Sequence, residues 1–266
     1  MDDYIASNRD LWDKWAEAHV SGPHYDVPAF IAGGNRLHSV ELDEVGDVAG
    51  KSLLHLQCHF GLDTLSWARL GAIATGADFS PKAIEAARSI AETCGLPATF
   101  VLSDVYDLPN NLSGAFDIVF TSYGAIYWLP DLARWAKVIA HFLKPGGAFH
   151  IVDFHPMGCV YEGSEPDLEM VFPYFHTDEP WVEEVVGSYA TDEPIKGVEH
   201  GWAHTLADVV NALIGAGLRI DFLHEFPYST VPHPPFVTKC EDGQYRLKEH
   251  DGKIALLFSV KATRER

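Results

Sequence analysis

The sequence predicts a doubly wound α/β fold, in which helices cover both faces of a mainly parallel sheet. From residue 51 to residue 153, short apolar runs typical of buried strands alternate with segments whose apolar residues recur at helical spacing. Strands joined through helices imply right-handed crossovers and parallel pairing. Apolar residues make up 47% of the 266 residues, which is enough for one continuous core.

The chain before this alternation predicts helices. Apolar residues recur at helical spacing over residues 4–20, and Gly22 follows them as a stop. A second helix is expected over residues 36–48. We interpret residues 1–48 as an N-terminal helical cap on a single domain that comprises residues 1–266.

Residues 49–154 predict the core of that domain. Ser80 and Asp131 are expected to cap helices at their N-termini, and Gly95 is expected to end the helix that Ser80 begins. The expected strands are residues 52–56, 73–77, 98–102, 116–121 and 148–153.

Residues 155–200 interrupt the alternation after the fifth strand. They hold eleven acidic residues and one basic residue, Lys196, together with several aromatics. A segment of this length inside a compact domain is usually functional or disordered, and the aromatics favour an ordered lid insertion. The alternative is an oligomer interface, such as that of a homodimer. Residues 201–266 then predict a helix capped by Thr205 and two last strands, 218–226 and 253–260.

Charge and cysteine usage limit the partners. The formal net charge is −19 without any basic cluster, which makes nucleic acid and anionic membranes poor partners and favours a neutral or cationic small molecule. The alternative is that acidity only maintains solubility. The four cysteines are widely spaced, which is typical of a reduced, cytoplasmic protein. The start, MDDYIASNRD, is not typical of a secretory signal, and no apolar stretch approaches a membrane span.

Polar residues follow the first four expected strands, at the edge where ligands bind to open parallel sheets. A carboxylate at Asp78 could accept both hydroxyls of a ribose, and it lies 17 residues beyond Gly61. Asp104 could accept from an adenine amino group, and the backbone N–H of Val105 could serve a ring nitrogen. Each Asp alone could equally be a cap or turn residue, but their order and spacing together favour a nucleoside ligand.

Four stretches carry a resemblance to a known family: LLHLQCHFGLDTLSWARLGA, ATGADFSPKAIEAARS, FVLSDVYDLP and FDIVFTSYGAIYWLPDLARWAKVIAHFLKPGG. They resemble the Rossmann-like (class I) methyltransferases that use S-adenosylmethionine (SAM). The later stretch GWAHTLADVVNALIGAGLRIDFLHEFP is similar to a bacterial small-molecule subgroup of that family. The resemblance implies a seven-stranded sheet whose last strand is antiparallel, and methyl transfer from SAM to O or N of a small-molecule acceptor.

The resemblance also implies that SAM lies across the loops after the first four strands. The residues expected to bind the cofactor are Gln57, Cys58, His59, Gly61, Asp78, Phe79, Ser80, Ser103, Asp104, Val105, Ser122 and Tyr123. The insertion after the fifth strand is then expected to cover the acceptor site and to set substrate choice.

The first loop departs from the family pattern. Relatives usually have Gly-x-Gly-x-Gly there, whereas this chain has Gln57, His59 and Gly61 at the three positions. Because glycine adopts positive φ and lets a ligand approach, the two larger residues are expected to point away from the cofactor or to contact it. The missing glycines count against a nucleotide-dependent oxidoreductase, which needs them to bind a pyrophosphate.

Methyl transfer needs few catalytic groups, because the donor is already activated and positioning supplies much of the rate. A general base is required only when the acceptor must lose a proton early. His155, His204 and His59 are candidate bases, and the alternative is that they are structural histidines among fourteen. A second alternative follows, since no catalytic residue is obligatory: a SAM-binding protein without transfer activity, acting as a regulator or scaffold.

Aromatic residues are expected around the acceptor. Tyr127, a further catalytic candidate, and its neighbours Tyr123 and Trp128 could wall the acceptor site or meet the sulfonium by cation–π contact, or they could simply pack. In the N-terminal segment, the aromatic residues could close over the cofactor or belong to the core; they are Trp12, Trp15 and Tyr25. No metal site and no hydrolase triad is expected, because the sequence has no HExxH, spaced Cys/His set or Gly-x-Ser-x-Gly.

Overall fold

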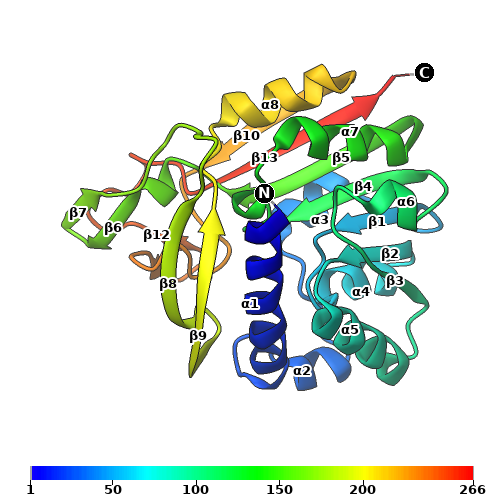
Figure 1. The fold of residues 1–266 in the computed structure, drawn as a ribbon, viewed down its shortest axis with the longest axis horizontal. Coiled ribbons are helices and arrows are strands. Elements are labelled where there is room, and N and C mark those ends of the chain that lie inside the picture. The colour runs from blue at the N-terminus through cyan, green and yellow to red at the C-terminus, as the bar shows by residue number, and fades with distance from the viewer. Residues whose placement is uncertain (1, 266) are drawn as a thin grey trace.

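A computed structural model describes residues 2–265 and places a seven-stranded sheet at the centre of the molecule (Figure 1). The strand order is β10-β13-β5-β4-β1-β2-β3. All neighbouring strands pair in parallel except β13, which is antiparallel to both β5 and β10, so the expected sheet is confirmed. The strands are β1 (Ser52–Leu56), β2 (Ile73–Asp78), β3 (Ala98–Leu102), β4 (Phe116–Ser122), β5 (Leu143–Phe154), β10 (Leu218–Phe226) and β13 (Leu257–Arg264).

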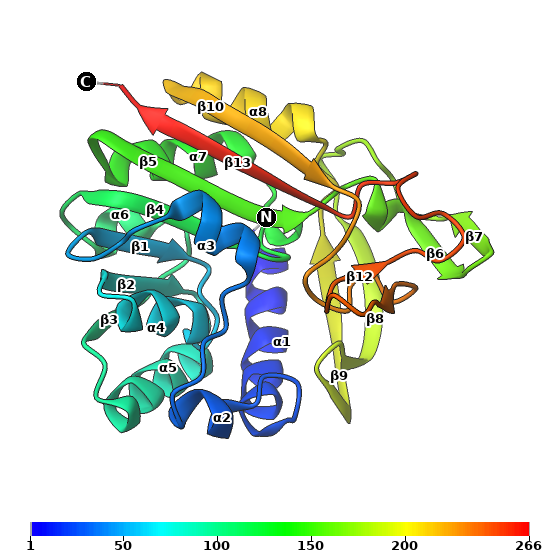
Figure 2. The same cartoon turned by 180° about the vertical axis from the view of Figure 1, so that it is seen from behind.

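Helices cover both faces of the sheet, as Figures 1 and 2 show from opposite sides. The side chains of β1 alternate between the two faces, so that Leu54 and Leu56 pack in one cluster with Trp135, and Leu53 packs in another with Trp67. The helices of the first face are α6 (Leu108–Asn111), α7 (Leu132–Phe142) and α8 (Leu206–Gly215); those of the second are α3 (Ser39–Val45), α4 (Leu62–Arg69) and α5 (Pro81–Cys94).

The expected helix signals are confirmed. The side chains of Ser80, Asp131 and Thr205 cap α5, α7 and α8, each by accepting a hydrogen bond from the backbone N–H three residues later. Gly95 ends α5 in the left-handed conformation, with φ of 63°. These caps fix where each helix begins and therefore hold the loops that follow the strands.

Several element boundaries differ from the sequence expectation. The helix expected over residues 36–48 is only α3, which ends at Gly46 with φ of 72°, and a short helix α2 (Val27–Ile31) precedes it. The last strand is shifted toward the C-terminus, because residues 250–253 form a turn and the pairing with β5 begins at Leu257. β5 starts before its expected position, because Leu143 already pairs with Phe116 across an irregular register.

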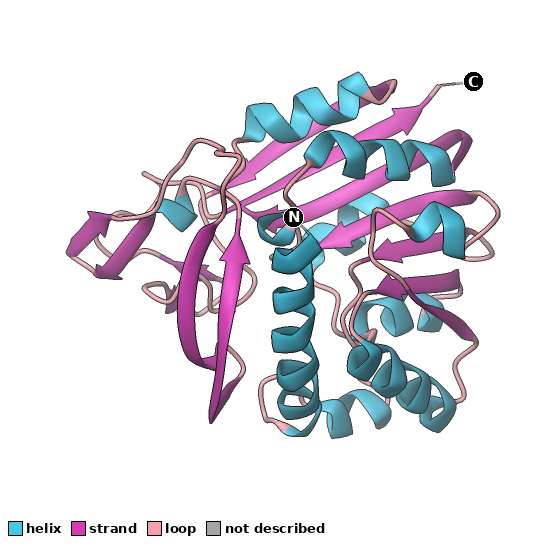
Figure 3. Ribbon diagram, viewed as in Figure 1, coloured by secondary structure: helices cyan, strands magenta, loops and turns pink. Residues whose placement is uncertain are grey.

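The insertion after β5 forms two hairpins set apart from the main sheet (Figure 3). The first is β6 (Tyr161–Ser164) with β7 (Asp167–Met170), and the second is β8 (Trp181–Ser188) with β9 (Thr191–Gly201). A third short hairpin, β11 (Thr238–Lys239) with β12 (Tyr245–Arg246), belongs to the segment of the chain that connects β10 to β13. The remaining elements are the 3-10 helices η1 (Ile126–Trp128) and η2 (Gly158–Val160). The division into cap, core and lid stays a prediction.

Helix α1 (Asp2–Ser21) runs across the carboxyl ends of the strands, between the sheet and the β8–β9 hairpin (Figures 1 and 2). Leu11 and Trp15 are buried against this hairpin, Leu11 beside Gly197. The polar side chains of α1 bond to the hairpin. The residues that make these hydrogen bonds are Ser7, Asn8, Lys14, Trp15 and His19. Within residues 2–265, no helix combines the length and the apolar character needed to span a membrane.

Candidate functional site

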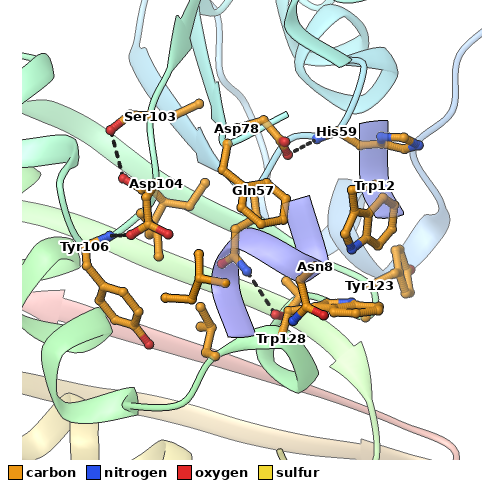
Figure 4. Close-up of a pocket in the computed structure, with 18 of the residues that line it drawn as sticks. Asn8, Trp12, Gln57, His59, Asp78, Ser103, Asp104, Tyr106, Tyr123 and Trp128 are labelled. Atoms are coloured by element: carbon orange, nitrogen blue, oxygen red, sulfur yellow. Dashed lines mark hydrogen bonds between the residues drawn. The ribbon is translucent and has the colours of Figure 1, made fainter. Parts of the chain in front are cut away.

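A pocket lies at the carboxyl ends of β1, β2, β3 and β4, under helix α1 (Figure 4). It holds about 850 Å³ of empty space, with the open solvent at its mouth included. Eight of the twelve expected cofactor residues line it: Gln57, His59, Asp78, Phe79, Ser103, Asp104, Val105 and Tyr123. The other four, Cys58, Gly61, Ser80 and Ser122, belong to the same loops but lie outside the lining.

Asp78 ends β2 and presents a fixed carboxylate to this pocket. One oxygen, Oδ2, accepts from the backbone N–H of His59 at 2.8 Å, and the other, Oδ1, accepts from that of Ser80 at 2.9 Å. Burial raises the pKa of the carboxyl to about 6, so that it is largely ionised at neutral pH. Because each oxygen can accept more than one hydrogen bond, the group retains capacity for two ligand hydroxyls.

Asp104 occupies the corresponding place after β3. Its Oδ1 accepts from the backbone N–H of Tyr106 at 2.8 Å, and the Ser103 hydroxyl donates to the Asp104 carbonyl oxygen at 2.8 Å. Asn111 in turn donates to Ser103 Oγ at 2.9 Å. Burial raises the pKa of the Asp104 carboxyl. The loop is thus held by its own hydrogen bonds, with a second carboxylate directed at the pocket that Asp78 also lines.

The loop after β1 has the left-handed backbone that favours glycine at three positions, although only the third of them is a glycine. Gln57, His59 and Gly61 have φ of 54°, 52° and 78°. For a non-glycine residue this conformation costs roughly 1–2 kcal/mol, and strain of this kind is concentrated at functional sites. The Gln57 amide nitrogen donates to Ala125 O at 2.9 Å, and the His59 ring lies 3.1 Å from His19 Nδ1. The two large side chains therefore have protein partners beside the pocket.

Aromatic rings from three distant segments close the pocket. Trp12 of α1 packs edge-to-face on Trp128, with 5.3 Å between ring centroids, and on His59, at 5.0 Å. Tyr189, at the tip of the β8–β9 hairpin, also lines the pocket and shares a hydrogen bond with the Tyr25 hydroxyl. An aromatic wall of this kind suits a cationic or planar ligand.

Sequence reasoning missed most of the lining that comes from α1 and from the β4 end. Asn8 on α1 gave no signal, because a single Asn in a helix is normally a surface residue. Trp15, in contrast, is buried against the hairpin and does not line the pocket. The residues not expected from the sequence are Ile5, Asn8, Leu56, Ala77, Tyr106, Gly124, Ala125, Leu129 and Tyr189.

The three expected catalytic residues lie outside the pocket lining. His155 Nε2 pairs with Glu225 at 2.8 Å, and His204 Nε2 bonds to a backbone carbonyl at 2.6 Å. Burial lowers the pKa of both rings, that of His204 to about 4, so the His204 ring is neutral at pH 7. The Tyr127 hydroxyl donates to Glu199 at 3.0 Å. Their catalytic role stays a prediction, and each has a structural partner.

A buried carboxyl, Glu41 of α3, lies behind Tyr123. Tyr123 lines the pocket, and its hydroxyl accepts a hydrogen bond from Thr230 at 2.9 Å. Glu41 is fully buried, and neither of its oxygens has a partner with hydrogen-bond geometry, although Tyr123 lies near enough to influence it. Burial, opposed in part by nearby hydrogen-bond donors, raises the pKa of Glu41 to about 7.

We expect Glu41→Gln to stabilise the protein above pH 7 but not below pH 5. The folded-state pKa exceeds that of the unfolded chain, so the folded protein binds the proton more tightly and loses stability as pH rises between the two values. The variant cannot ionise, and its advantage should grow by roughly 1.4 kcal/mol per pH unit through that window. Urea unfolding of both proteins at pH 5 and pH 8.5 measures it. A difference independent of pH would contradict the assignment.

The lining fits SAM. Two carboxylates at neighbouring strand ends match the ribose and adenine of an adenosine, and the aromatic wall matches a sulfonium. Among the lining residues that the structure describes there is no Lys or Arg, which favours a cationic ligand over a pyrophosphate. Residues 2–265 also bring together no group of three or more metal-binding side chains.

Fold and site together define a class of protein: an α/β enzyme that binds an adenosine-containing cofactor at the strand ends of a seven-stranded sheet with one antiparallel strand. Residues 53–147 match the family model described as a methyltransferase domain. An uncharacterized methyltransferase of Synechocystis sp., sll0829, is 32% identical over 57% of this chain and 68% of its own length. The chain belongs to the class I SAM-dependent methyltransferase family.

Other comparisons agree with this membership. The ubiquinone biosynthesis O-methyltransferase of Xanthomonas oryzae pv. oryzae (strain PXO99A) is 34% identical over 52% of this chain and 54% of its own length. The chain thus spans about half the length of that enzyme. The crystal structure of a SAM-dependent methyltransferase from Mesorhizobium loti has the same fold, with a TM-score of 0.59, 22% identity, and coverage of 88% of this chain and 100% of its own.

Proposed function

We propose that this protein transfers the methyl group of SAM to an oxygen or nitrogen atom of a small organic molecule. The observation that carries the proposal is the Asp78 carboxylate, fixed by two backbone N–H groups at the end of β2 and directed at the pocket. It would hold the ribose hydroxyls, and Asp104 would accept from the adenine amino group. The loops at the ends of β1 and β4 would then contact the methionine part of SAM.

The chain's contribution to the reaction would be positional. SAM supplies an activated methyl group, and holding donor and acceptor in line can provide roughly 7–11 kcal/mol of the barrier. Trp12 and Trp128 would wall the sulfonium side of the site, where cation–π contact contributes about 0.5–2 kcal/mol. α1 and the β8–β9 hairpin would exclude water from the reacting atoms.

The acceptor class follows from charge. The formal net charge is −19, and residues 155–200, which contribute Tyr189 to the pocket lining, hold eleven of the acidic residues. We infer a neutral or cationic acceptor, such as a phenol, an alcohol or an amine, rather than a phosphate ester or nucleic acid. The four cysteines are unpaired, which supports a cytoplasmic protein.

Two measurements, made one after the other, test the proposal. Isothermal titration calorimetry with S-adenosylhomocysteine, the demethylated cofactor, should show one site per chain. Turnover of methyl-labelled SAM with a panel of phenols, alcohols and amines should then label at least one acceptor. Binding without labelling of any panel member would favour a non-transferring SAM-binding protein. The absence of S-adenosylhomocysteine binding would overturn the proposed function itself.

We expect Asp104→Ala to weaken S-adenosylhomocysteine more than the analogue that lacks the adenine amino group. The lost acceptor should cost about 1.5–3 kcal/mol for the first ligand and little for the second. Asp107→Ala is the matched control, because Asp107 is an exposed residue of the same loop outside the lining. Calorimetry with both ligands checks this. Equal losses would mean that Asp104 does not contact the amino group.

A further inference from the structure

The cofactor pocket has a cover made of two segments that are far apart in the sequence. Helix α1 contributes Ile5, Asn8 and Trp12 to the pocket lining, and the β8–β9 hairpin contributes Tyr189. Figures 1 and 2 show the helix and the hairpin side by side along most of their lengths. The hairpin has few buried side chains of its own, since all eight residues of β8 are exposed or only partly covered by other segments. Its position therefore depends on α1.

Asn8 makes two hydrogen bonds with the hairpin. Its Nδ2 donates to the carbonyl oxygen of His200 at 2.8 Å, and its Oδ1 accepts from the backbone N–H of His200 at 2.9 Å. The side-chain amide thus pairs with β9 as a neighbouring strand would, although it comes from a helix 192 residues away. Asn8 is 1% exposed, so water cannot replace either bond without movement of the helix.

Four other side chains of α1 make one hydrogen-bond contact each with the hairpin. Ser7 donates to Val198 O at 3.2 Å and Lys14 donates to Lys196 O at 3.2 Å, the second at an exposed position. At the far end of the helix, Trp15 donates to Gly187 O at 2.9 Å, and His19 lies 2.7 Å from Ser188 Oγ. The hydrogen bonds thus run from one end of the hairpin to the other, with the two-bond contact at the pocket.

We propose that Asn8 is a positioning residue that joins α1 to the β8–β9 hairpin, so that the two segments open and close over the cofactor as one body. This inference rests on the proposed function. It has a consequence for binding: the insertion, which is not one of the loops after β1 to β4, controls how fast the cofactor enters and leaves. Cofactor and acceptor binding are then coupled, because the segment beside the acceptor and the helix above the cofactor move together.

The test compares Asn8→Asp with the wild type. The variant has the same size and can still accept from the His200 N–H, but it puts a second carboxylate oxygen against the His200 carbonyl oxygen, so one of the two bonds is replaced by a repulsion. We expect S-adenosylhomocysteine to dissociate about tenfold faster, measured by stopped-flow Trp fluorescence, since Trp12 and Trp128 line the pocket. Arg9→Ala is the matched control, because Arg9 is an exposed residue of the same helix turn; its rate should stay within about twofold.

Hydrogen exchange separates positioning from simple destabilisation. In the wild type, S-adenosylhomocysteine should slow exchange of the β9 amides, although no residue of β9 lines the pocket. In Asn8→Asp this protection should disappear, while protection of the loops after β1 and β2 remains. Unchanged dissociation, or β9 protection that survives in the variant, would overturn the inference and leave the proposed function intact. A wild type that does not bind the ligand would overturn both.

Discussion

Asp78→Ala should reduce the affinity for S-adenosylhomocysteine by about 10- to 100-fold, because the ribose loses a charged acceptor worth roughly 1.5–3 kcal/mol. The carboxylate also accepts the backbone N–H groups of His59 and Ser80, so its removal frees the loop after β1 as well. Calorimetry at pH 7.5 measures the change. An affinity within twofold of the wild type would show that Asp78 does not hold the ribose.

The pH dependence of the same site gives an internal check. The pKa of Asp78 is about 6 because burial disfavours its charge. A ligand that needs the ionised form binds fully above that value and progressively more weakly as pH falls through it. Asp78→Asn keeps the size of the side chain but cannot ionise, so its weaker affinity should show no step near pH 6. A wild-type affinity that is flat between pH 5 and pH 8 would contradict this.

Gly61→Ala should destabilise the protein by roughly 2–5 kcal/mol and weaken cofactor binding, because Gly61 belongs to the loop that carries Gln57 and His59. A Cβ at this position would lie 2.5 Å and 2.7 Å from ring atoms of Phe100 and 3.1 Å from the Cβ of Ala87, and φ is +78°. Left-handed backbone costs roughly 1–2 kcal/mol for a residue with a side chain, and overpacking of the core adds roughly 1–3 kcal/mol. Denaturant unfolding measures the sum.

Gly95→Ala is the control that separates the two contributions. Gly95 has φ of +63°, but a Cβ there would meet nothing within 4 Å. We therefore expect only the backbone cost, about 1 kcal/mol, and unchanged S-adenosylhomocysteine affinity. If both variants lose the same stability, the approach of Phe100 is not what requires glycine at position 61.

Most of the core could be predicted from the sequence, because its signals are local. Each strand of the parallel part is a short apolar run, and the caps at Ser80, Asp131 and Thr205 mark helix starts within one residue. Carboxyl ends of parallel strands meet at one edge of a sheet, so residues that follow four separate strands could be placed together. Eight of the twelve expected cofactor residues indeed line one pocket.

The cover of the pocket could not be predicted, because its contacts are long-range. Nothing near Asn8 in the sequence indicates that its amide pairs with His200, and nothing near Tyr189 indicates a ring beside the first loop. The hairpin strands lack the alternation of a half-buried sheet, since Val182 and Val186 are exposed. The sequence places His155 after a strand and His204 before a helix, but neither position determines the direction of the side chain.

The pairing of α1 with β9 also has a consequence for how the chain folds. α1 precedes every strand of the sheet in the chain, but the strand that receives its Asn8 amide is 192 residues away. Contacts of such sequence separation close late, because the entropy of the intervening loop is lost before they form. The sheet strands β1 to β5 can assemble while the helix is still unattached, with Leu11 and Trp15 uncovered until residue 201 has emerged from the ribosome. Docking of α1 onto β9 then follows the assembly of β1 to β5, so the cover of the cofactor site forms after the strand-end loops beneath it.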